Sequence, residues 1–150
     1  MCFNNIVRVR KIFVEVNREM VEQVKFTEKT IDYAKNPRNQ GEMADANAIG
    51  EVSNPDCGDS TVMYLKVEND IIQDVTFETF GCAAAVASSS ILTEMIKGKT
   101  VEEAYKLTEE AVADELGGLP EKKLHCSVIG IEAMRKAINN YRNGVVRSDD

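Results

Sequence analysis

Hydrophobic and polar residues alternate along the first half of the chain in a way that predicts strands. Across residues 60–68, one face is formed by every second side chain, namely Thr61, Met63, Leu65 and Val67. Residues 72–80 repeat this two-residue period, and Asn69-Asp70 between the two stretches is typical of a tight turn. Another strand is predicted over residues 46–53, broken at Gly50. Together the three stretches predict a three-stranded antiparallel sheet.

After the third predicted strand, the spacing of apolar residues changes to that of helices. Residues 83–97 are rich in helix-favouring Ala, Leu and Met, and Gly98 ends the stretch. Thr100 and Glu103 form a capping-box pattern that predicts a helix to about residue 107. Further helices are predicted from the cap Thr27 to Ala34, over residues 109–116 and over residues 127–141. Strands followed by helices, without regular alternation, indicate an α+β domain.

The two ends of the chain fit no single pattern. Residues 7–10 alternate like a strand, whereas Phe13, Val16, Met20 and Val24 recur at roughly helical spacing. We leave the structure of residues 1–25 open and expect a mobile or disordered arm, or sequence upstream of a natural start near Met20. Residues 144–150 form a polar tail, so one folded domain is expected over residues 26–143.

Composition and charge narrow the classes of function. The chain has 150 residues, of which 43% are hydrophobic and 29% charged, as in an ordinary globular domain. Its 18 basic and 25 acidic residues give a net charge of −7, which argues against a nucleic-acid partner. No apolar run approaches the ~20 residues of a membrane-spanning helix. Because no secretory signal is recognisable, we expect a cytoplasmic protein whose scattered cysteines stay reduced.

Three of the four cysteines fall where one predicted element passes into the next. Cys57 lies in a loop before a strand, whereas Cys82 and Cys126 each open a helix. A thiol at a helix N-terminus meets unpaired backbone N–H groups and the positive end of the helix dipole, and both lower its pKa. These three sulfurs are therefore candidate metal ligands or nucleophiles, while Cys2 lies outside the pattern and is assigned no role.

The neighbours of these cysteines add oxygen and nitrogen donors. Asp59 follows Cys57 by two positions. His125 directly precedes Cys126. Three thiolates with one of these side chains would make a four-coordinate site for iron or zinc. The gaps between the three cysteines, 24 and 43 residues, match no CxxC-type finger, so a metal site, buried core thiols and a nucleophile all stay open at this point.

Four short motifs carry a resemblance to a known family. In chain order they are Asn36-Pro37-Arg38-Asn39, Pro55-Asp56-Cys57-Gly58-Asp59, Gly81-Cys82-Ala83-Ala84-Ala85-Val86-Ala87-Ser88-Ser89-Ser90 and Lys123-Leu124-His125-Cys126-Ser127. Over about residues 26–141 the chain resembles the IscU/NifU family of iron–sulfur cluster assembly scaffolds. The resemblance implies a SufE/NifU-like fold of the α+β class, in which a three-stranded antiparallel sheet packs against several helices.

For function, the resemblance implies a scaffold or carrier and not an enzyme. Such a protein would receive iron, receive sulfur from a cysteine desulfurase of the IscS/NifS type, assemble a [2Fe–2S] cluster and pass it to apo iron–sulfur acceptor proteins. The cluster ligands carried over from the family are Cys57, Cys82 and Cys126, with His125 or Asp59 supplying the remaining ligation. In the family, Asp59 is the residue associated with cluster lability. Cys126 is the expected first persulfide acceptor.

The resemblance also bears on the choice of metal and partners. Family members bind zinc at the same place, so the alternative function is a zinc-binding sulfur acceptor of the sulfurtransferase type. The segment from Cys82 to Cys126 has no room for the insertion of the zinc-dependent branch, which favours the scaffold branch. Leu119-Pro120-Glu121-Lys122-Lys123 replaces the Leu-Pro-Pro-Val-Lys run that an Hsp70-type chaperone binds in bacterial members, so chaperone-assisted transfer is doubtful. A homo-oligomer around a shared cluster stays open.

Two interpretations from other classes compete with the scaffold. Cys126 could be a nucleophile with His125 as its base, but adjacent side chains rarely point at each other well enough for that hydrogen bond. Alternatively, a zinc ion would only hold the fold together. Among the remaining residues, we expect Phe77 and Phe80 in the core, and we expect the small residues Ser88-Ser89-Ser90 at a close helix contact.

Overall fold

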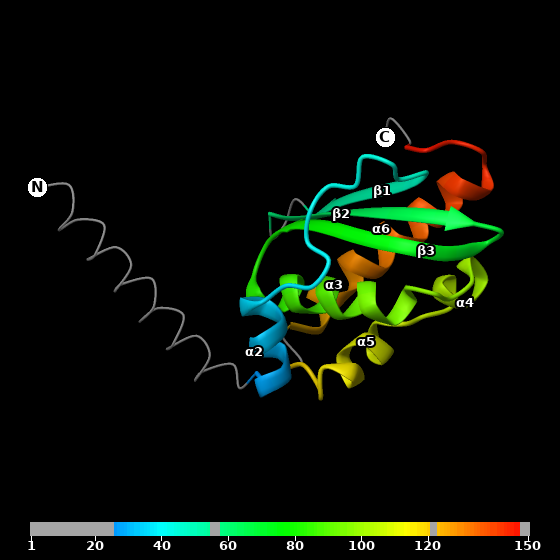
Figure 1. Cartoon of the computed structure of the whole chain (residues 1–150). Helices are drawn as coiled ribbons and strands as arrows, with labels where there is room; N and C mark the ends of the chain where they lie inside the picture. The colour runs from blue at the N-terminus through cyan, green and yellow to red at the C-terminus, as the bar shows by residue number, and fades with distance from the viewer. Residues whose placement is uncertain (1–25, 55–57, 121–122, 148–150) are drawn as a thin grey trace, which may run out of the picture.

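The structure is a computed structural model, and it describes residues 26–54, 58–120 and 123–147. Three strands lie together in one sheet, and most of the helices follow them in the chain (Figure 1). In chain order the elements are α2 (Glu28–Lys35), β1 (Ala48–Asn54), β2 (Asp59–Glu68), β3 (Ile71–Phe80), α3 (Ala83–Ile96), α4 (Val101–Tyr105), α5 (Glu109–Glu115) and α6 (Leu124–Arg142). The predicted α+β class is confirmed.

The sheet has the order β1-β2-β3, and both strand pairs are antiparallel, as predicted. At the turn between β2 and β3, Asn69 and Asp70 have φ angles of 54° and 61°, which the favoured two-residue hairpin turns require. Met63 and Phe77 pair across β2 and β3 and are both fully buried. The two-residue period seen in the sequence therefore marks the inner face of the sheet.

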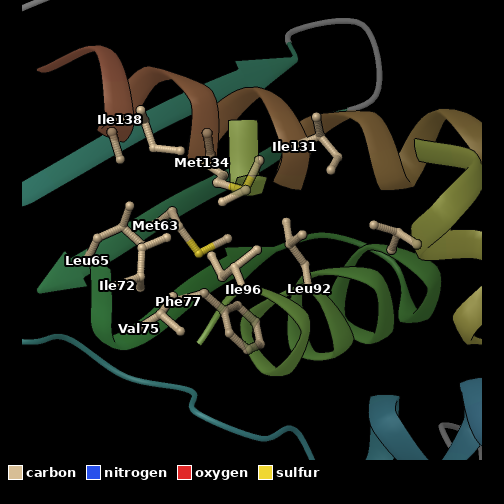
Figure 2. Close-up of a cluster of buried hydrophobic side chains, with 14 of the residues drawn as sticks. Met63, Leu65, Ile72, Val75, Phe77, Leu92, Ile96, Ile131, Met134 and Ile138 are labelled. Carbon is tan, nitrogen blue, oxygen red and sulfur yellow. The ribbon is translucent and has the colours of Figure 1, made fainter. Parts of the chain in front are cut away.

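Helices α3 and α6 cover one face of the sheet, with α6 against β1 and β2 and α3 against β3 (Figure 1). The core lies between these two layers (Figure 2). Its larger side chains are Met63, Leu65, Ile72, Val75, Phe77, Leu92, Ile96, Ile131, Met134 and Ile138. In the part of the chain that the structure describes, no helix combines the length and apolar character needed to cross a membrane.

Gly50 does not break the first strand, so that prediction is wrong. β1 runs through this position, and α6 lies directly on its backbone. A Cβ atom at Gly50 would lie 2.1 Å from the carbonyl oxygen of Ala133 and 2.5 Å from the backbone nitrogen of Ala137. Glycine is therefore needed here for the close approach of a helix. The approach fixes how α6 crosses the sheet.

α6 begins at Leu124, three residues before the predicted start at Ser127. Ser127 already lies inside the helix, where its hydroxyl donates a hydrogen bond of 2.6 Å to the carbonyl of Leu124. The N-cap is Lys123, whose side chain makes no capping hydrogen bond. As a result, Cys126 lies inside the first helical turn.

Candidate metal centre

Three chain segments meet at the end of the sheet where β2 begins and β3 ends. Asp59 is the first residue of β2, Cys82 directly precedes α3, and Cys126 lies in the first turn of α6. One carboxylate oxygen and the two sulfurs all lie within 4.8 Å of one another. Folding therefore brings three of the five predicted site residues around one point.

Cys82 occupies the N-cap position of α3 and is half-buried. The pKa of its thiol is lowered to about 6, chiefly because the Cys126 thiol donates a hydrogen bond to it. The backbone N–H of Ala85, which the helix leaves unpaired at its N-terminus, adds a smaller stabilisation of the thiolate. Cys82 is therefore mainly a thiolate at neutral pH, the form that binds metals.

Cys126 is the proton donor of this pair. Its sulfur lies 3.3 Å from that of Cys82, and its side chain is only 1% exposed. Donation to Cys82 raises the pKa of Cys126, and burial raises it further. The two sulfurs thus share one proton and one negative charge. A bound cation would replace that proton and allow both sulfurs to be thiolates.

Charged side chains act on both sulfurs. The ammonium group of Lys123, at the start of α6, lowers the pKa of Cys82 and of Cys126. Asp59, whose side chain is 7% exposed, raises both pKa values. A carboxylate buried beside a thiolate repels it, and a cation between them would remove that repulsion.

Gly81 makes room for the carboxylate of Asp59. A Cβ atom at Gly81 would lie 2.8 Å from Asp59 Oδ1 and 3.2 Å from the Cβ of Ala85. A side chain at this position would therefore push against the carboxylate, which glycine leaves free to lie beside the sulfurs. This packing explains why glycine precedes Cys82 in the sequence motif.

His125 lies at the edge of the centre and is exposed. Its Nε2 atom is 3.5 Å from the sulfur of Cys126, so the expectation that these neighbours would not contact each other is wrong. The contact is possible because both residues lie in the first turn of α6. His125 also borders a pocket of about 250 Å³, whose other lining residues are Val52, Ser53, Asn54, Val128, Ile129 and Glu132.

Cys57, the remaining predicted ligand, lies outside the described residues. In the sequence it precedes Asp59 by two positions. Glu121 and Lys122 of the segment compared with the chaperone-binding run also lie outside them. The prediction for Cys57 and the doubt about the chaperone therefore stay predictions.

Comparison with known proteins decides the family. The sequence model described as "NifU-like N terminal domain" matches residues 14–147, which is most of the chain. This chain belongs to that family. The resemblance inferred from the four motifs is thereby confirmed.

The NifU-like domain has relatives of high identity. The "Iron-sulfur cluster assembly scaffold protein IscU 1" of Archaeoglobus fulgidus is 51% identical over 123 residues, which cover 81% of this chain and 80% of that protein. The scaffold protein IscU of Aquifex aeolicus is 49% identical over 118 residues, covering 77% and 75%. A crystal structure of a putative scaffold protein for the SUF system from Fervidobacterium islandicum matches with a TM-score of 0.66 and 28% identity, over 75% of this chain and 96% of that one.

The donor set of this NifU-like domain fits a thiophilic metal. Two sulfurs and one carboxylate oxygen already converge, and His125 places a ring nitrogen near one of the sulfurs. Thiolate, imidazole and carboxylate ligands suit zinc and iron better than they suit magnesium or calcium, which prefer oxygen alone. By its chemistry, this set of donor atoms would suit iron or zinc.

The three consecutive serines of α3, Ser88 to Ser90, were predicted to lie at a close helix contact, and they also make hydrogen bonds that hold α3 in place beside the centre. All three serines are buried, and each contacts a different part of the domain. Ser88 donates to the carbonyl of Ala85 and, at 3.4 Å, to that of Cys126. Ser89 accepts from Thr79 of β3, and Ser90 accepts from the backbone N–H of Arg38. The predicted close helix contact is confirmed: Ser88 and Ser89 of α3 lie against Cys126 and Gly130 of α6.

Phe80 does not lie in the core, so that prediction is wrong, although Phe77 is fully buried as expected. The side chain of Phe80 is 77% exposed at the end of β3, two positions before Cys82. Strand alternation gives the reason, because residues 77 and 80 are separated by an odd number of positions and point to opposite faces.

Proposed function

We propose that this NifU-like domain is a scaffold, not an enzyme, on which a [2Fe–2S] cluster is assembled and from which it passes to apo-proteins. The ligands that we assign are Cys57, Cys82 and Cys126, with Asp59 or His125 completing the set. The observation that carries the proposal is the convergence of the Asp59 carboxylate with the sulfurs of Cys82 and Cys126 within 4.8 Å. The names of the relatives, which are scaffold proteins, support the same conclusion.

A site that combines thiolates with a carboxylate or imidazole ligand suits a cluster that must be released to another protein. Thiolates bind iron strongly, whereas one carboxylate or imidazole ligand is weaker and leaves one metal more open to attack. Asp59 is the ligand that we associate with this lability. Because it is buried beside the sulfurs, its removal would leave a more thiolate-dominated site.

Sulfur is supplied by a cysteine desulfurase, and Cys126 is the first persulfide acceptor that we assign. Cys126 is 1% exposed, whereas Cys82 is half-buried and has the lowered pKa. Sulfur transfer to Cys126 therefore requires that the docked donor uncover it and that the shared proton move to Cys82. Conversion of the bound sulfur to cluster sulfide then needs two electrons, which a thiol reductant supplies in the assay below.

Anaerobic reconstitution tests the proposal. The metal-free protein is mixed with ferrous iron, L-cysteine, a thiol reductant and a catalytic amount of a purified cysteine desulfurase. We expect visible absorption bands of a [2Fe–2S] cluster, with iron and acid-labile sulfide in equal amounts, and transfer of the cluster to an apo-ferredoxin. Cys126→Ser should lose the stable cluster, and Cys2→Ser, outside the four motifs, should keep it.

Other outcomes of the same assay decide against the proposal. A colourless protein that retains zinc and carries a persulfide would instead be the zinc-binding sulfur acceptor. A full cluster in Cys126→Ser would remove Cys126 from the ligand set. A protein that gains neither colour nor labile sulfide is not a scaffold.

A further inference from the structure

Two cysteines of the metal centre contact each other through their sulfur atoms. The sulfurs of Cys82 and Cys126 lie 3.3 Å apart, and a disulfide bond measures about 2.05 Å, so they are about 1.2 Å from bonding distance. If both side chains move equally, each sulfur shifts by about 0.6 Å. A rotation of about 20° around the Cα–Cβ bond is enough for such a shift, and it leaves a side chain within its rotamer. The two sulfurs can therefore bond to each other without a change of the backbone.

The packing of α3 against α6 holds these sulfurs together. Cys82 directly precedes α3, and Cys126 lies in the first turn of α6. One helical turn further along, the hydroxyl of Ser88 lies 3.4 Å from the carbonyl oxygen of Cys126. A Cβ atom at Gly130 would lie only 3.3 Å from the hydroxyl oxygen of Ser89. The contact between the sulfurs is therefore fixed by the close approach of two whole helices.

The two sulfurs differ in how a solute reaches them. Cys82 is half-buried, whereas Cys126 is only 1% exposed. An apolar cluster surrounds Cys126, formed by the buried Ala84 and Ala85 with the partly buried Phe26 and Leu119. A small solute therefore meets the sulfur of Cys82 first. An accessible cysteine with a second cysteine in contact behind it is the arrangement of redox-reactive pairs, in which the second sulfur resolves the oxidised first one.

The carboxylate of Asp59 favours a neutral product at this place. One of its oxygens lies within 4.8 Å of both sulfurs, and its side chain is 7% exposed. A buried carboxylate repels a thiolate beside it, whereas a disulfide carries no charge. Joining the sulfurs therefore removes the repulsion in the metal-free protein, as a cation would remove it in the metal-bound protein.

We infer that Cys82 and Cys126 are a redox modification site, at which a hydroperoxide joins them in a reversible disulfide that closes the metal centre. Thiolates bind metals and a disulfide does not, so the modification withdraws two of the three donor atoms that converge here. The inference goes beyond the proposed function, because it concerns the metal-free protein in the presence of an oxidant. A bound metal ion occupies both thiolates and protects them from the reaction.

The reaction is balanced in two steps. The thiolate of Cys82 attacks one oxygen of hydrogen peroxide, the O–O bond breaks, and hydroxide leaves, so that Cys82 becomes a sulfenic acid. The sulfur of Cys126 then attacks the sulfur of this sulfenic acid, and its own proton leaves with the hydroxyl group as water. Two electrons pass from the sulfurs to the peroxide. Because the second step is intramolecular, it outruns the attack of a second peroxide on Cys82.

Mass spectrometry of the oxidised protein tests the inference directly. Metal-free, reduced protein is treated with a small excess of hydrogen peroxide and then with an alkylating agent. Lys66 separates Cys57 from Cys82, and Lys97 separates Cys82 from Cys126, so trypsin places the three cysteines on different peptides. We expect a protein lighter by two hydrogen atoms, in which the peptide of Cys82 is joined to that of Cys126 and Cys57 is alkylated. Dithiothreitol should restore the parent mass.

Metal binding provides the second measurement. The oxidised protein should fail to retain zinc against a chelator with which the reduced protein competes, and dithiothreitol should restore the binding. Zinc-loaded protein should form the disulfide at least about tenfold more slowly than metal-free protein, because the ion has to leave first. An oxidised protein that holds zinc as tightly as the reduced one overturns the inference.

Cysteine variants identify the resolving sulfur. Cys2→Ser, outside the centre, is the matched control, and it should form the disulfide as the parent does. Cys57→Ser should form the same disulfide. In the double variant Cys57→Ser/Cys126→Ser, Cys82 should instead gain two oxygen atoms as a sulfinic acid, which dithiothreitol does not reverse. A disulfide that involves Cys57 in the parent, a sulfinic acid at Cys82 of the parent, or a Cys82 that peroxide leaves unchanged overturns the inference.

Discussion

Replacement of Gly81 by alanine tests whether the position of the Asp59 carboxylate matters to the metal centre. Gly81 is not among the residues with positive φ, so alanine can adopt its backbone conformation without strain. The added Cβ atom would lie 2.8 Å from Asp59 Oδ1 and 3.0 Å from Asp59 Cγ. The carboxylate therefore has to move by about 0.6 Å to reach ordinary contact.

The displacement should weaken the binding of a single zinc ion by the metal-free protein much more than it weakens the fold. Overpacking costs about 1–3 kcal/mol, but the Gly→Ala change itself contributes ~0.4–1 kcal/mol through the unfolded chain. We therefore expect the free energy of unfolding of the metal-free protein to fall by about 2.6 kcal/mol or less. Metal–ligand distances tolerate only ~0.2 Å, so a carboxylate moved this far no longer ligates. A change in a neighbouring residue that misorients a metal ligand typically lowers the affinity by about 10–100-fold, and we expect a loss of this size for zinc.

Two measurements separate these effects. Urea unfolding of the metal-free protein gives the stability, and zinc competition with a chelator gives the affinity. The control is the same substitution in an Asp59→Ala background, where the clash with the carboxylate is absent and only the 3.2 Å contact with the Cβ of Ala85 remains, so Gly81→Ala should not change the zinc affinity appreciably. If Gly81→Ala leaves the zinc affinity unchanged, or lowers it equally without the carboxylate, then the position of the Asp59 carboxylate does not control metal binding.

Three further substitutions or titrations give distinct expected outcomes. Asp59→Ala should make the cluster longer-lived and slow its transfer to an apo-ferredoxin, because the weaker ligand is gone; unchanged transfer kinetics would exclude Asp59 from release. Gly50→Ala should lower the free energy of unfolding by about 3 kcal/mol or more, since its Cβ would overlap the backbone of α6; a parent-like urea midpoint would contradict the helix position. In the metal-free protein, iodoacetamide should alkylate Cys82 at a rate that rises with pH around a midpoint of about 6, because deprotonation creates the reactive thiolate. Cys126→Ala removes the hydrogen-bond donor and should move this midpoint upward, whereas an unshifted midpoint would show that Cys126 does not stabilise the thiolate.

Elements with strong local signals were predictable from the sequence. The alternation in β2 and β3 depends on which face of a strand is buried, and the Asn69-Asp70 turn depends on backbone angles that these residues tolerate. The capping box of Thr100 and Glu103 was confirmed because both of its hydrogen bonds form within one turn. The four motifs identified the family for a similar reason, since each is a short run of residues.

Predictions failed where a distant element decides the local structure. Gly50 was predicted to break a strand because the residues next to it in the sequence do not reveal that α6 packs against its backbone. The last helix was predicted to start at Ser127, but it starts at Leu124. Phe80 looked like core because aromatic residues usually are, whereas the register fixed by Thr79 and Ser89 turns it outward.

The sequence by itself determined the candidate residues of the centre, because Cys57, Asp59, Cys82, His125 and Cys126 lie at predicted element boundaries and in motifs. Only the tertiary structure decided the distances among those that it describes, Asp59, Cys82, His125 and Cys126. The 3.3 Å contact of Cys82 with Cys126, and the assignment of the thiolate to the first, depend on how α3 and α6 pack against each other and the sheet. The physical reason is one of range: strand periods and helix caps act over a few neighbouring residues, whereas the approach of two sulfurs depends on the packing of whole elements that are remote along the chain.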